Sequence, residues 1–172
     1  RTRFVTWDLA AKDALPLGPQ YQILAQVDGV VCLVDQTEEG AIAFQVGLIA
    51  ALRAEGLPAP EAGRYFSADH DGAVVGYVGL EGEGRDLLLR SLVVLADRKA
   101  RGLGSRMLAA VETVAGDLGG ARLHLLTTTA EPFFTRHGYR AADRQTAPEA
   151  IRRTREFAGL CPASAAYLTK DL

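Results

Sequence analysis

Residues 99–104, Lys-Ala-Arg-Gly-Leu-Gly, combine glycines and basic side chains in a pattern that suits phosphate binding. They follow an almost wholly apolar run, residues 87–95, and precede residues 105–118, whose apolar positions recur at helical spacing. We therefore expect a strand to enter a glycine-rich turn that opens a helix. The first N–H groups of a helix lack intrahelical acceptors, and the helix dipole favours an anion beside them. Because Gly102 and Gly104 have no Cβ atom, a phosphate can approach this backbone closely.

Two well-known nucleotide-binding motifs do not fit this loop. A dinucleotide-binding G-x-G-x-x-G motif needs a third glycine where this chain has Met107. A Walker A loop ends in Gly-Lys-Ser/Thr, whereas here Gly104 is followed by Ser105 and Arg106. For the loop taken alone, a tight turn before an ordinary helix start stays open as an alternative.

The elements around the loop predict a mixed α/β fold, because strand-like and helix-like segments alternate along the chain. The expected strands are residues 21–27, 30–34, 64–70, 73–80, 87–95, 122–127, 139–142 and 165–172. The expected helices are residues 8–15, a segment through 42–52 that ends near Gly56, and residues 103–118, 131–136 and 147–155. The last of these is predicted from a capping box, Thr146-x-x-Glu149.

The composition predicts a globular cytoplasmic protein rather than one that binds nucleic acid or membranes. The chain has 172 residues, 48% of them hydrophobic, and a net charge of −2. No apolar run reaches the roughly 18–20 residues of a membrane-spanning helix. Cys32 and Cys161 lie far apart and are expected to be free thiols. No Cys/His spacing typical of a metal site occurs, so no metal is expected.

A second motif follows the loop after one helix and one strand: Ala130-Glu131-Pro132-Phe133-Phe134, ending in Gly138-Tyr139. Together with Leu92-x-Val94 and Lys99-x-x-Gly102-x-Gly104, this motif resembles the GNAT superfamily of acyl-CoA N-acyltransferases. The resemblance covers residues 29–172 and implies a central, mostly antiparallel sheet that splays between two parallel strands and is flanked by helices. Residues 1–28 belong to no motif; we expect an N-terminal extension that adds a strand or serves a homodimer.

The resemblance implies that acetyl-CoA is the co-substrate. Its pyrophosphate would lie on the amides of residues 99–105, and its pantetheine would lie along the strand edge at residues 92–94, much like an added strand. The amide of Val94 would polarise the thioester carbonyl. Arg98, Arg101 and Arg136 are candidates for the CoA phosphates, with solvated surface charge as the alternative. The implied CoA-binding residues are Leu92, Val93, Val94, Lys99, Ala100, Arg101, Gly102, Leu103, Gly104, Ser105 and Arg136.

A narrower resemblance indicates the acceptor. Residues 76–81, 125–134 and 156–165 are similar to the N-acetyltransferases encoded with arsenic-resistance genes, relatives of enzymes that acetylate arsinothricin and phosphinothricin. The chain also resembles the short amino-acid N-acetyltransferases that act on glutamate. The implied function is detoxifying transfer of acetyl to the amino group of a small amino-acid-like molecule. Glutamate acetylation in biosynthesis and a catalytically silent acyl-CoA sensor stay open as alternatives.

The chain departs from the family at two catalytic positions. Phe134 stands where many GNAT enzymes carry a tyrosine that protonates the leaving thiolate, and Leu88 stands where some carry a glutamate base. Water, a hydroxyl of residues 127–129 or Tyr77 are the alternatives for the acid. Glu81, at the end of the preceding strand, is the first candidate for the base, with an exposed loop carboxylate as the alternative.

Arg90 is the first candidate for substrate binding, and Thr128 and Phe134 are assigned to the same acceptor side. A lone guanidinium in an apolar strand must find an anion, because burying it unpaired is costly. A substrate carboxylate or arsinate could bind its fork of donors; an internal salt bridge with Glu81 or Asp86 is the alternative. Strand parity would put Arg90 on the same face as Leu92 and Val94. Among other candidates for chemistry, His124 is expected to be a satisfied core residue, His137 structural, and Cys161 a packing residue.

Overall fold

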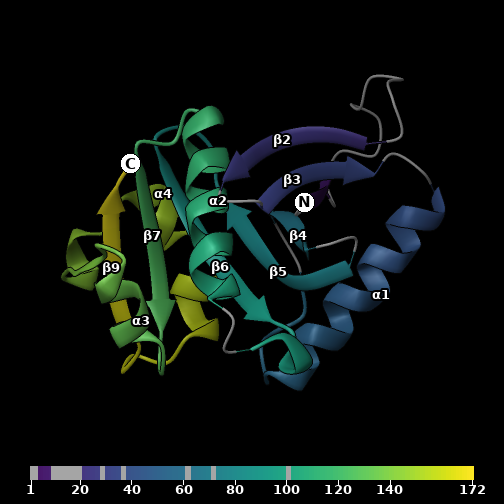
Figure 1. The fold of residues 1–172 in the computed structure, drawn as a ribbon. Coiled ribbons are helices and arrows are strands. Elements are labelled where there is room, and N and C mark those ends of the chain that lie inside the picture. Colours follow the sequence, from purple (N-terminus) through teal and green to yellow (C-terminus); the bar gives the residue numbers. More distant parts are fainter. Residues whose placement is uncertain are drawn as a thin grey trace. The chain divides into compact units, whose positions relative to one another are not determined.

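The structure, a computed structural model, describes residues 4–8, 21–27, 30–35, 38–60, 63–70, 73–99 and 102–172. Strands and helices alternate along it, which confirms the mixed α/β class (Figure 1). The strands are β1 (Phe4–Asp8), β2 (Tyr21–Val27), β3 (Val30–Asp35), β4 (Arg64–His70), β5 (Ala73–Glu81), β6 (Asp86–Val94), β7 (Arg122–Thr127), β8 (Arg140–Ala141) and β9 (Ala166–Asp171). The helices are α1 (Glu38–Ala54), α2 (Leu103–Asp117), α3 (Glu131–Arg136) and α4 (Glu149–Arg152), with short turns η1 (Ala96–Arg98), η2 (Arg144–Thr146) and η3 (Glu156–Leu160).

The chain divides into two compact units, and β5 and β6 contribute residues to both. The first unit comprises Arg1–Gly79 and Ser91–Val114. Its strands are hydrogen-bonded in the order β2-β3-β1-β4-β5-β6. Strand β1 runs parallel to β3 and antiparallel to β4, with Val5 opposite Leu33 on one side and Ser67 on the other. Part of the expected N-terminal extension is therefore an inner strand, and β2 lies at the end of the order.

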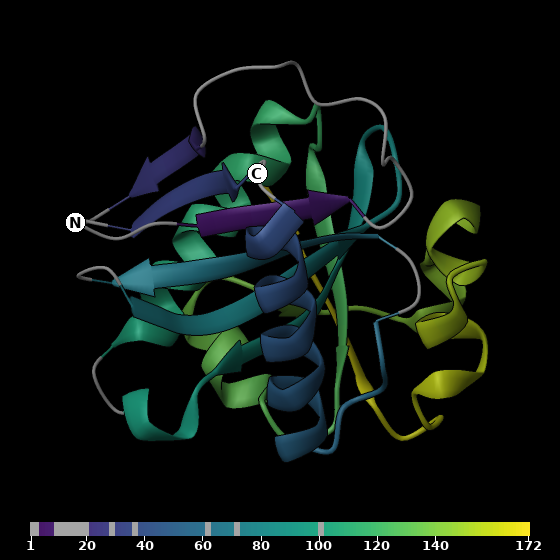
Figure 2. The same cartoon turned by 90° about the vertical axis from the view of Figure 1, so that its right-hand side faces the viewer.

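Two helices cover the two faces of the strands in the first unit. Helix α1 lies across the strands on one face (Figure 2). The residues packed together there are Phe44, Leu48, Ala51, Leu52, Tyr65, Tyr77 and Val93. Gly76 neighbours Tyr77 and faces the other way, toward α2. A Cβ atom on Gly76 would lie 2.8 Å from the Met107 sulfur and 2.3 Å from the Val93 carbonyl oxygen, so only glycine allows this close approach.

The second unit comprises Leu80–Arg90 and Ala115–Leu172, with strand order β6-β7-β9-β8. Strands β6 and β7 are parallel, from Asp86 opposite Arg122 to Leu88 opposite His124, which confirms the expected pair of parallel neighbours. Strand β9 pairs antiparallel with both β7 and β8. The core of this unit gathers Leu88, Leu126, Ala142, Ala147, Ile151, Phe157 and Tyr167.

The predicted helix over residues 147–155 is wrong in length, and its capping box does not form. Helix α4 covers only Glu149–Arg152, with Pro148 at the N-cap. The Thr146 hydroxyl donates instead to the Asp143 carbonyl oxygen, at 2.7 Å. The chain then enters the single π-helical turn η3. A local hydrogen bond has outcompeted the cap that the sequence pattern predicted.

The other difference concerns the N-terminal part of the chain. Asp8 is the last residue of β1 and not the start of a helix. Residues 9–15 of that predicted helix lie outside the described residues.

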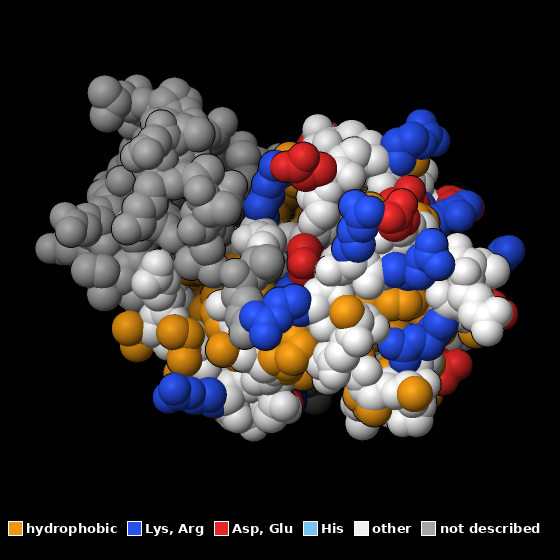
Figure 3. Space-filling view, turned by 180° about the vertical axis from the view of Figure 1, so that it is seen from behind, with side chains coloured by type: hydrophobic (Ala, Val, Ile, Leu, Met, Phe, Trp, Pro, Cys, Tyr) orange, Lys and Arg blue, Asp and Glu red, His pale blue; other side chains and the backbone are white. Residues whose placement is uncertain are grey.

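The surface carries mixed charge. On the face seen in Figure 3, acidic and basic side chains lie beside one another. Glu149, the first residue of α4, and Arg153, its C-cap residue, form an exposed ion pair. Among the described helices, none is both long and apolar enough to cross a membrane.

Candidate active site

The predicted phosphate loop leads into a helix start whose first amides have no acceptor within the helix. Gly102 has a φ of 68°, and no atom lies within 4 Å of the position where a Cβ would stand. The first hydrogen bond of α2 runs from the Arg106 N–H to the Gly102 carbonyl oxygen, at 3.3 Å. The amides of residues 103–105 therefore have no acceptor within the helix. The first turn of α2 holds no acidic side chain, so this end of the helix suits an anion.

The basic side chains beside this turn are held by surface ion pairs. The Lys99 ammonium lies 2.7 Å from a Glu55 carboxylate oxygen, and the Arg98 guanidinium lies 3.2 Å from Asp97. Exposed pairs of this kind are worth at most about 1 kcal/mol, so a phosphate can compete for either cation. Ala100 and Arg101, also predicted to bind CoA, lie outside the described residues.

The end of β6 presents a backbone donor away from β5. The Leu95 N–H donates to the Val75 carbonyl oxygen of β5, at 2.9 Å. Successive amides of a strand point to opposite edges, so the Val94 N–H points away from β5. Within the first unit β6 is the last strand of the order. This is the edge along which residues 92–94 were predicted to receive an extended ligand.

A backbone irregularity separates these residues from Arg90. Ser91 has a φ of 58°, a left-handed conformation that is uncommon for a residue other than glycine. The regular alternation of β6 is interrupted at this residue. Strand parity therefore does not carry from Arg90 to Leu92 and Val94, and the shared face expected from the sequence does not follow.

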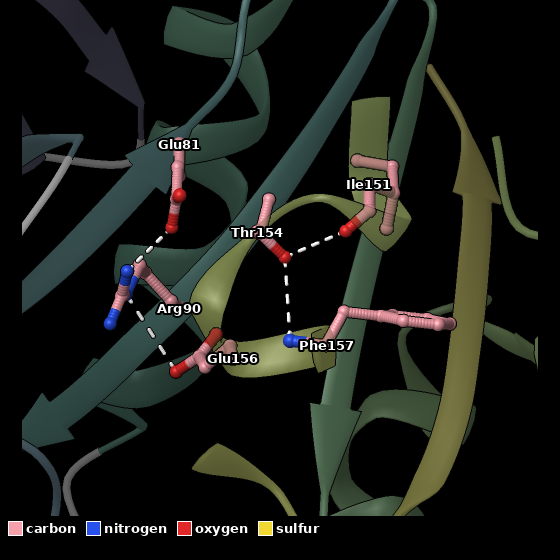
Figure 4. Close-up of polar contacts among 6 residues, drawn as sticks. All are labelled: Glu81, Arg90, Ile151, Thr154, Glu156 and Phe157. Carbon is pink, nitrogen blue, oxygen red and sulfur yellow. Dashed lines mark hydrogen bonds and ion pairs between the residues drawn. The ribbon is translucent and has the colours of Figure 1, made fainter. Parts of the chain in front are cut away.

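The second unit brings Arg90 together with two carboxylates (Figure 4). Arg90 Nη1 donates to Glu81 Oε2 at 2.5 Å, and Arg90 Nε lies 3.7 Å from Glu156 Oε1. The Arg90 side chain is 1% exposed, while those of Glu81 and Glu156 are 14% and 10% exposed. Glu81 and Arg90 were predicted site residues, and their pairing follows the salt-bridge alternative. We call these three residues the Arg90 triad.

Glu156 is a member of the triad that sequence reasoning missed. Burial raises the pKa of its carboxyl, Arg90 opposes this shift and the negative charge of Glu81 adds to it. Turn η3 holds the residue in place: the Thr154 hydroxyl donates to the Ile151 carbonyl oxygen, and the Cys161 N–H donates to the Glu156 carbonyl oxygen. Its only sequence signal was a charged residue after a predicted helix, which is ordinarily a surface position.

The other predicted acceptor-side residues lie around α3. Phe134 is buried, with its ring edge-to-face against Phe133 at 5.1 Å and against Tyr139 at 5.4 Å. Thr128 is exposed. Its neighbour Thr127 accepts the Ala130 N–H at 3.0 Å, which organises the turn into α3.

Arg136 lies in the last turn of α3 and is exposed. It lines an open surface depression together with Glu131, Pro132 and Thr135. The position of its side chain on the surface leaves the guanidinium accessible to a solvated anion such as a phosphate.

Residues 61–141 match the family described as acetyltransferase (GNAT) domain. Three solved structures share the fold. N-acetylglutamate synthase from Neisseria gonorrhoeae, complexed with coenzyme A and N-acetyl-glutamate, has a TM-score of 0.65 at 23% identity, over 86% of this chain and 36% of that one. Rv2747 from Mycobacterium tuberculosis, in complex with CoA, has a TM-score of 0.63 at 19% identity, over 76% and 95%.

An aminoglycoside 6'-N-acetyltransferase complexed with coenzyme A gives a TM-score of 0.57 at 15% identity, over 80% and 95% of the two chains. The fold is the GNAT fold. This chain spans about a third of the length of the N-acetylglutamate synthase chain that it matches. No curated protein sequence is significantly similar to it.

Two apolar residues of this GNAT fold stand where the resemblance led us to look for acid or base groups. Leu88 is fully buried and packs with Ile151 and Tyr167, and Phe134 is a core residue. The Tyr77 hydroxyl, one alternative for the acid, packs against Gly47 of α1, and burial raises its pKa. Glu81 is therefore the acid–base group in the described Arg90 triad that lies nearest to solvent.

Two histidines of this GNAT fold, His124 and His137, have structural partners, as predicted. His124 Nδ1 lies 2.6 Å from the Tyr167 hydroxyl and its Nε2 lies 2.8 Å from Asp86. Burial, followed by the charge of Asp86, raises the pKa of Tyr167 to about 12. His137 Nδ1 bonds the Phe133 carbonyl oxygen at the end of α3. Cys161 is a free thiol whose pKa is raised, first by burial, so it is poorly suited to act as a nucleophile.

The described residues contain no group of three or more His, Cys, Asp or Glu side chains that could hold a metal ion.

Proposed function

We propose that this protein is an acetyl-CoA-dependent N-acetyltransferase that acts on the amino group of a small amino-acid-like substrate. The observation that carries the proposal is the sequence of backbone donors from Val94 to the first turn of α2, in a fold shared with CoA complexes. The amides of residues 103–105, which have no acceptor within the helix, suit the CoA pyrophosphate, with Gly102 leaving room for its approach. Two exposed side chains, Lys99 and Arg136, and the half-buried Arg98 add positive charge for phosphates, and we assign Arg101 the same role.

We assign the proton transfer to Glu81. The substrate ammonium gives a proton to the Glu81 carboxylate, directly or through one water, and the freed nitrogen lone pair attacks the thioester carbonyl carbon. The carbonyl oxygen takes the developing negative charge, and the Val94 N–H donates a hydrogen bond to it. When the tetrahedral intermediate collapses, the nitrogen gives its second proton to water, the C–S bond breaks and the thiolate leaves with the electron pair. A thiol has an ordinary pKa near 8.5, so protonation by water suffices and no tyrosine is needed at position 134.

For the acceptor we propose an arsinothricin-type amino acid, acetylated in the cytoplasm as a detoxification. The support is the resemblance of residues 76–81, 125–134 and 156–165 to arsenic-resistance N-acetyltransferases. Glutamate is the second candidate, because the fold is shared with an N-acetylglutamate synthase complexed with N-acetyl-glutamate. We keep Thr128 and Phe134 as acceptor-side residues. Arg90 acts on the acceptor through the carboxylates it holds.

The test combines cofactor binding with thiol release on a panel of amines. Acetyl-CoA at 100 times its dissociation constant should stabilise the fold by about 2.7 kcal/mol and raise the melting temperature by several degrees. Thiol release should be fastest with arsinothricin or phosphinothricin, then glutamate, and slow with an aminoglycoside. Absence of a thermal shift and of heat on calorimetric titration would exclude the cofactor. Binding without turnover on any amine would indicate the acyl-CoA sensor instead.

Glu81→Gln tests the assigned base. It should lower kcat/KM by about 100-fold or more, most strongly at low pH, where the amine is almost wholly protonated and depends on a base. A variant with the rate of the parent at every pH excludes Glu81. The matched control is Glu83→Gln, an exposed glutamate two residues further along the chain, which should keep the parental profile.

A further inference from the structure

Glu156 on turn η3 is a buried carboxylate to which the described residues supply no hydrogen-bond donor. Its side chain is 10% exposed. Arg90 Nε lies 3.7 Å from Glu156 Oε1, close enough for an ion pair but beyond ordinary hydrogen-bond distance. Among the residues that the structure describes, none donates a hydrogen bond to this carboxylate. Buried polar groups nearly always have a hydrogen-bond partner, so Glu156 points to a donor from outside the chain.

The other carboxylate beside Arg90 is bonded differently. Figure 4 shows the carboxylates of Glu81 and Glu156 on two sides of the Arg90 guanidinium. Glu81 Oε2 accepts a hydrogen bond from Arg90 Nη1 at 2.5 Å, whereas Glu156 is held only by the longer ion pair. The greater remaining capacity to accept hydrogen bonds therefore lies on Glu156.

The charges of the Arg90 triad favour one further cation. With all three groups ionised, the triad carries one positive and two negative charges. Burial raises the pKa of the Glu156 carboxyl, Arg90 opposes this shift and the negative charge of Glu81 adds to it. A second cation beside Glu156 would favour its ionised form and balance the charges. An ammonium group suits this position, because it carries one positive charge and three N–H donors.

We propose that Glu156 binds the ammonium group of the acceptor by accepting a charge-assisted hydrogen bond from it, and so holds the acceptor nitrogen beside Glu81. This inference rests on the proposed function, in which the acceptor is an amine and Glu81 takes its proton. One N–H of the ammonium remains on Glu156 while another points to Glu81. After Glu81 has taken one proton, the neutral amine still donates to Glu156, and its lone pair is free to attack the thioester.

Turn η3 holds Glu156 in place without help from a ligand. The Thr154 hydroxyl donates to the Ile151 carbonyl oxygen at 2.7 Å and accepts the Phe157 N–H at 3.4 Å (Figure 4). The Phe157 ring packs edge-to-face on Tyr167 at 5.5 Å. The carboxylate is therefore positioned before an acceptor arrives, which lowers the cost of binding. Replacement of its charge should leave the turn in position.

Arg144 is a cation on the same segment, but it is occupied with the backbone. Its guanidinium donates to the Phe157 carbonyl oxygen at 3.3 Å and to the Pro162 carbonyl oxygen at 2.9 Å. The charges that shift the pKa of the Glu156 carboxyl are those of Arg90 and Glu81. Arg144 therefore fixes the segment and does not take the place of the proposed ammonium.

The direct test measures binding without transfer, by calorimetric titration of the protein saturated with CoA. The probes are L-glutamate and L-phosphinothricin, each compared with the analogue that carries a hydroxyl group in place of the amino group. The parent should bind each amine about 10- to 100-fold more tightly than its hydroxyl analogue, because the analogue lacks the charge-assisted hydrogen bond. In Glu156→Gln this preference should fall by about tenfold. A parent without the preference, or a variant that keeps it in full, overturns the proposal.

The matched control is Glu149→Gln. Glu149 is an exposed glutamate on α4 that pairs with Arg153, and its variant should keep the parental preference for the amines. If Glu156→Gln does not fold, the parent labelled with 13C at its glutamate side-chain carboxyls decides the matter. The Glu156 signal, assigned from its absence in Glu156→Asp, should shift with L-glutamate and not with 2-hydroxyglutarate. A signal that responds equally to both, or to neither, overturns the proposal.

The kinetic test separates binding of the amine from removal of its proton. Glu156→Gln should raise the KM of the acceptor by about tenfold or more and leave the KM of acetyl-CoA unchanged. Its kcat should fall much less than that of Glu81→Gln. A loss confined to kcat contradicts the assigned role.

The two proposals fail in different ways. A protein that prefers the amines in binding but releases thiol with none of them defeats the proposed function alone. A protein that acetylates an amine but shows no such preference defeats the inference alone.

Discussion

Arg90 shows that a single buried charge in the sequence can predict a contact with an anion. A guanidinium in the apolar strand β6 had to find an anion, and the sequence left two kinds open: a bound substrate or a carboxylate of the protein. The structure shows two carboxylates of the protein beside the guanidinium. Glu81 Oε2 lies 2.5 Å from Arg90 Nη1, and Glu156 Oε1 lies 3.7 Å from Arg90 Nε. Taking such charges out of water costs several kcal/mol per ion, and only close partners offset it. Arg90 is thus the centre on which both carboxylates depend.

Arg90→Ala should therefore lower the free energy of unfolding by about 3–5 kcal/mol at neutral pH, because it leaves two buried carboxylates without their cation. The loss should shrink as the pH falls. Burial raises the pKa of the Glu156 carboxyl, and in the variant Arg90 no longer opposes this shift. The folded state therefore binds more protons, and stability decreases as the pH rises from the unfolded value near 4.3 through the raised pKa of the folded state. Urea unfolding at several pH values measures this. Arg153→Ala, at an exposed ion pair, is the control and should cost less than about 1 kcal/mol; equal losses in the two variants would contradict the argument.

The site was predicted in part for reasons visible at these residues. The phosphate-binding turn at residues 102–105 could be predicted because glycine spacing and the start of a helix are local features of the sequence. Glu81 and Arg90 lie nine residues apart on two strands joined by a short loop, and a salt bridge between them was among the alternatives. The role of Glu156 in the Arg90 triad could not be predicted from the sequence. Its burial depends on the π-helical turn η3, which brings Glu156 beside β6 although it lies 66 positions after Arg90 in the chain. Nothing in its own neighbourhood distinguishes it from a surface glutamate.

Helix α1 and strand β5 are matched at one point of contact between elements. The Tyr77 hydroxyl occupies the space that a side chain at Gly47 would need: a Cβ there would lie 2.0 Å from the hydroxyl oxygen and 3.1 Å from the ring carbon that bears it. The Tyr77 ring is also held edge-to-face by Phe44 at 5.7 Å. A helix glycine ordinarily costs about 1 kcal/mol relative to alanine. At position 47, glycine nevertheless allows α1 to pack closely against Tyr77 of β5.

Gly47→Ala should consequently destabilise the protein by about 1–3 kcal/mol, despite the better helix propensity of alanine. Tyr77→Phe removes the oxygen atom in the way, so the double variant should recover most of the loss and give a coupling energy of about 1 kcal/mol or more. Chemical unfolding of the four proteins of the cycle measures it. Gly116→Ala on α2, where no atom lies within 4 Å of the added Cβ, is the control and should not be destabilising. Additive effects at residues 47 and 77 would show that the contact is not made.

At the level of elements, the predictions held where the pattern was long and local. Helices α1, α2 and α3 and strands β2 to β7 lie close to their expected limits, because amphipathic spacing, glycine stops and apolar runs decide them. The capping box at Thr146 was wrong because its hydroxyl found the nearer Asp143 carbonyl oxygen, at 2.7 Å. Strand β1 was missed because its five residues carry too little pattern. Its state is decided by the two strands that flank it.

For the molecule as a whole, the N-terminal residues join the sheet, with β2 at the end of the strand order and β1 inside it. Residues 1–28 were expected to be an extension at the rim of the sheet or an arm for a partner. In the structure β1 is an inner strand: it is parallel to β3 at Phe4 and Val5, and antiparallel to β4 along its whole length. An inner strand satisfies backbone groups on both sides, and its loss would leave two strands with unpaired edges.

Deletion of residues 1–28 should therefore abolish the cooperative thermal transition or lower the melting temperature by more than about 10 °C. Val5→Pro tests the same point without shortening the chain. It removes one amide from an inner strand, which costs about 3 kcal/mol or more and should lower the melting temperature by about 6–12 °C. Val5→Ala keeps the amide and is the control for the side chain; the proline variant should melt well below it. If the deletion variant melts as the parent does, β1 contributes nothing to the stability of the sheet. Acetyl-CoA binding by the proline variant below its transition would show separately that the α2 loop does not depend on this strand.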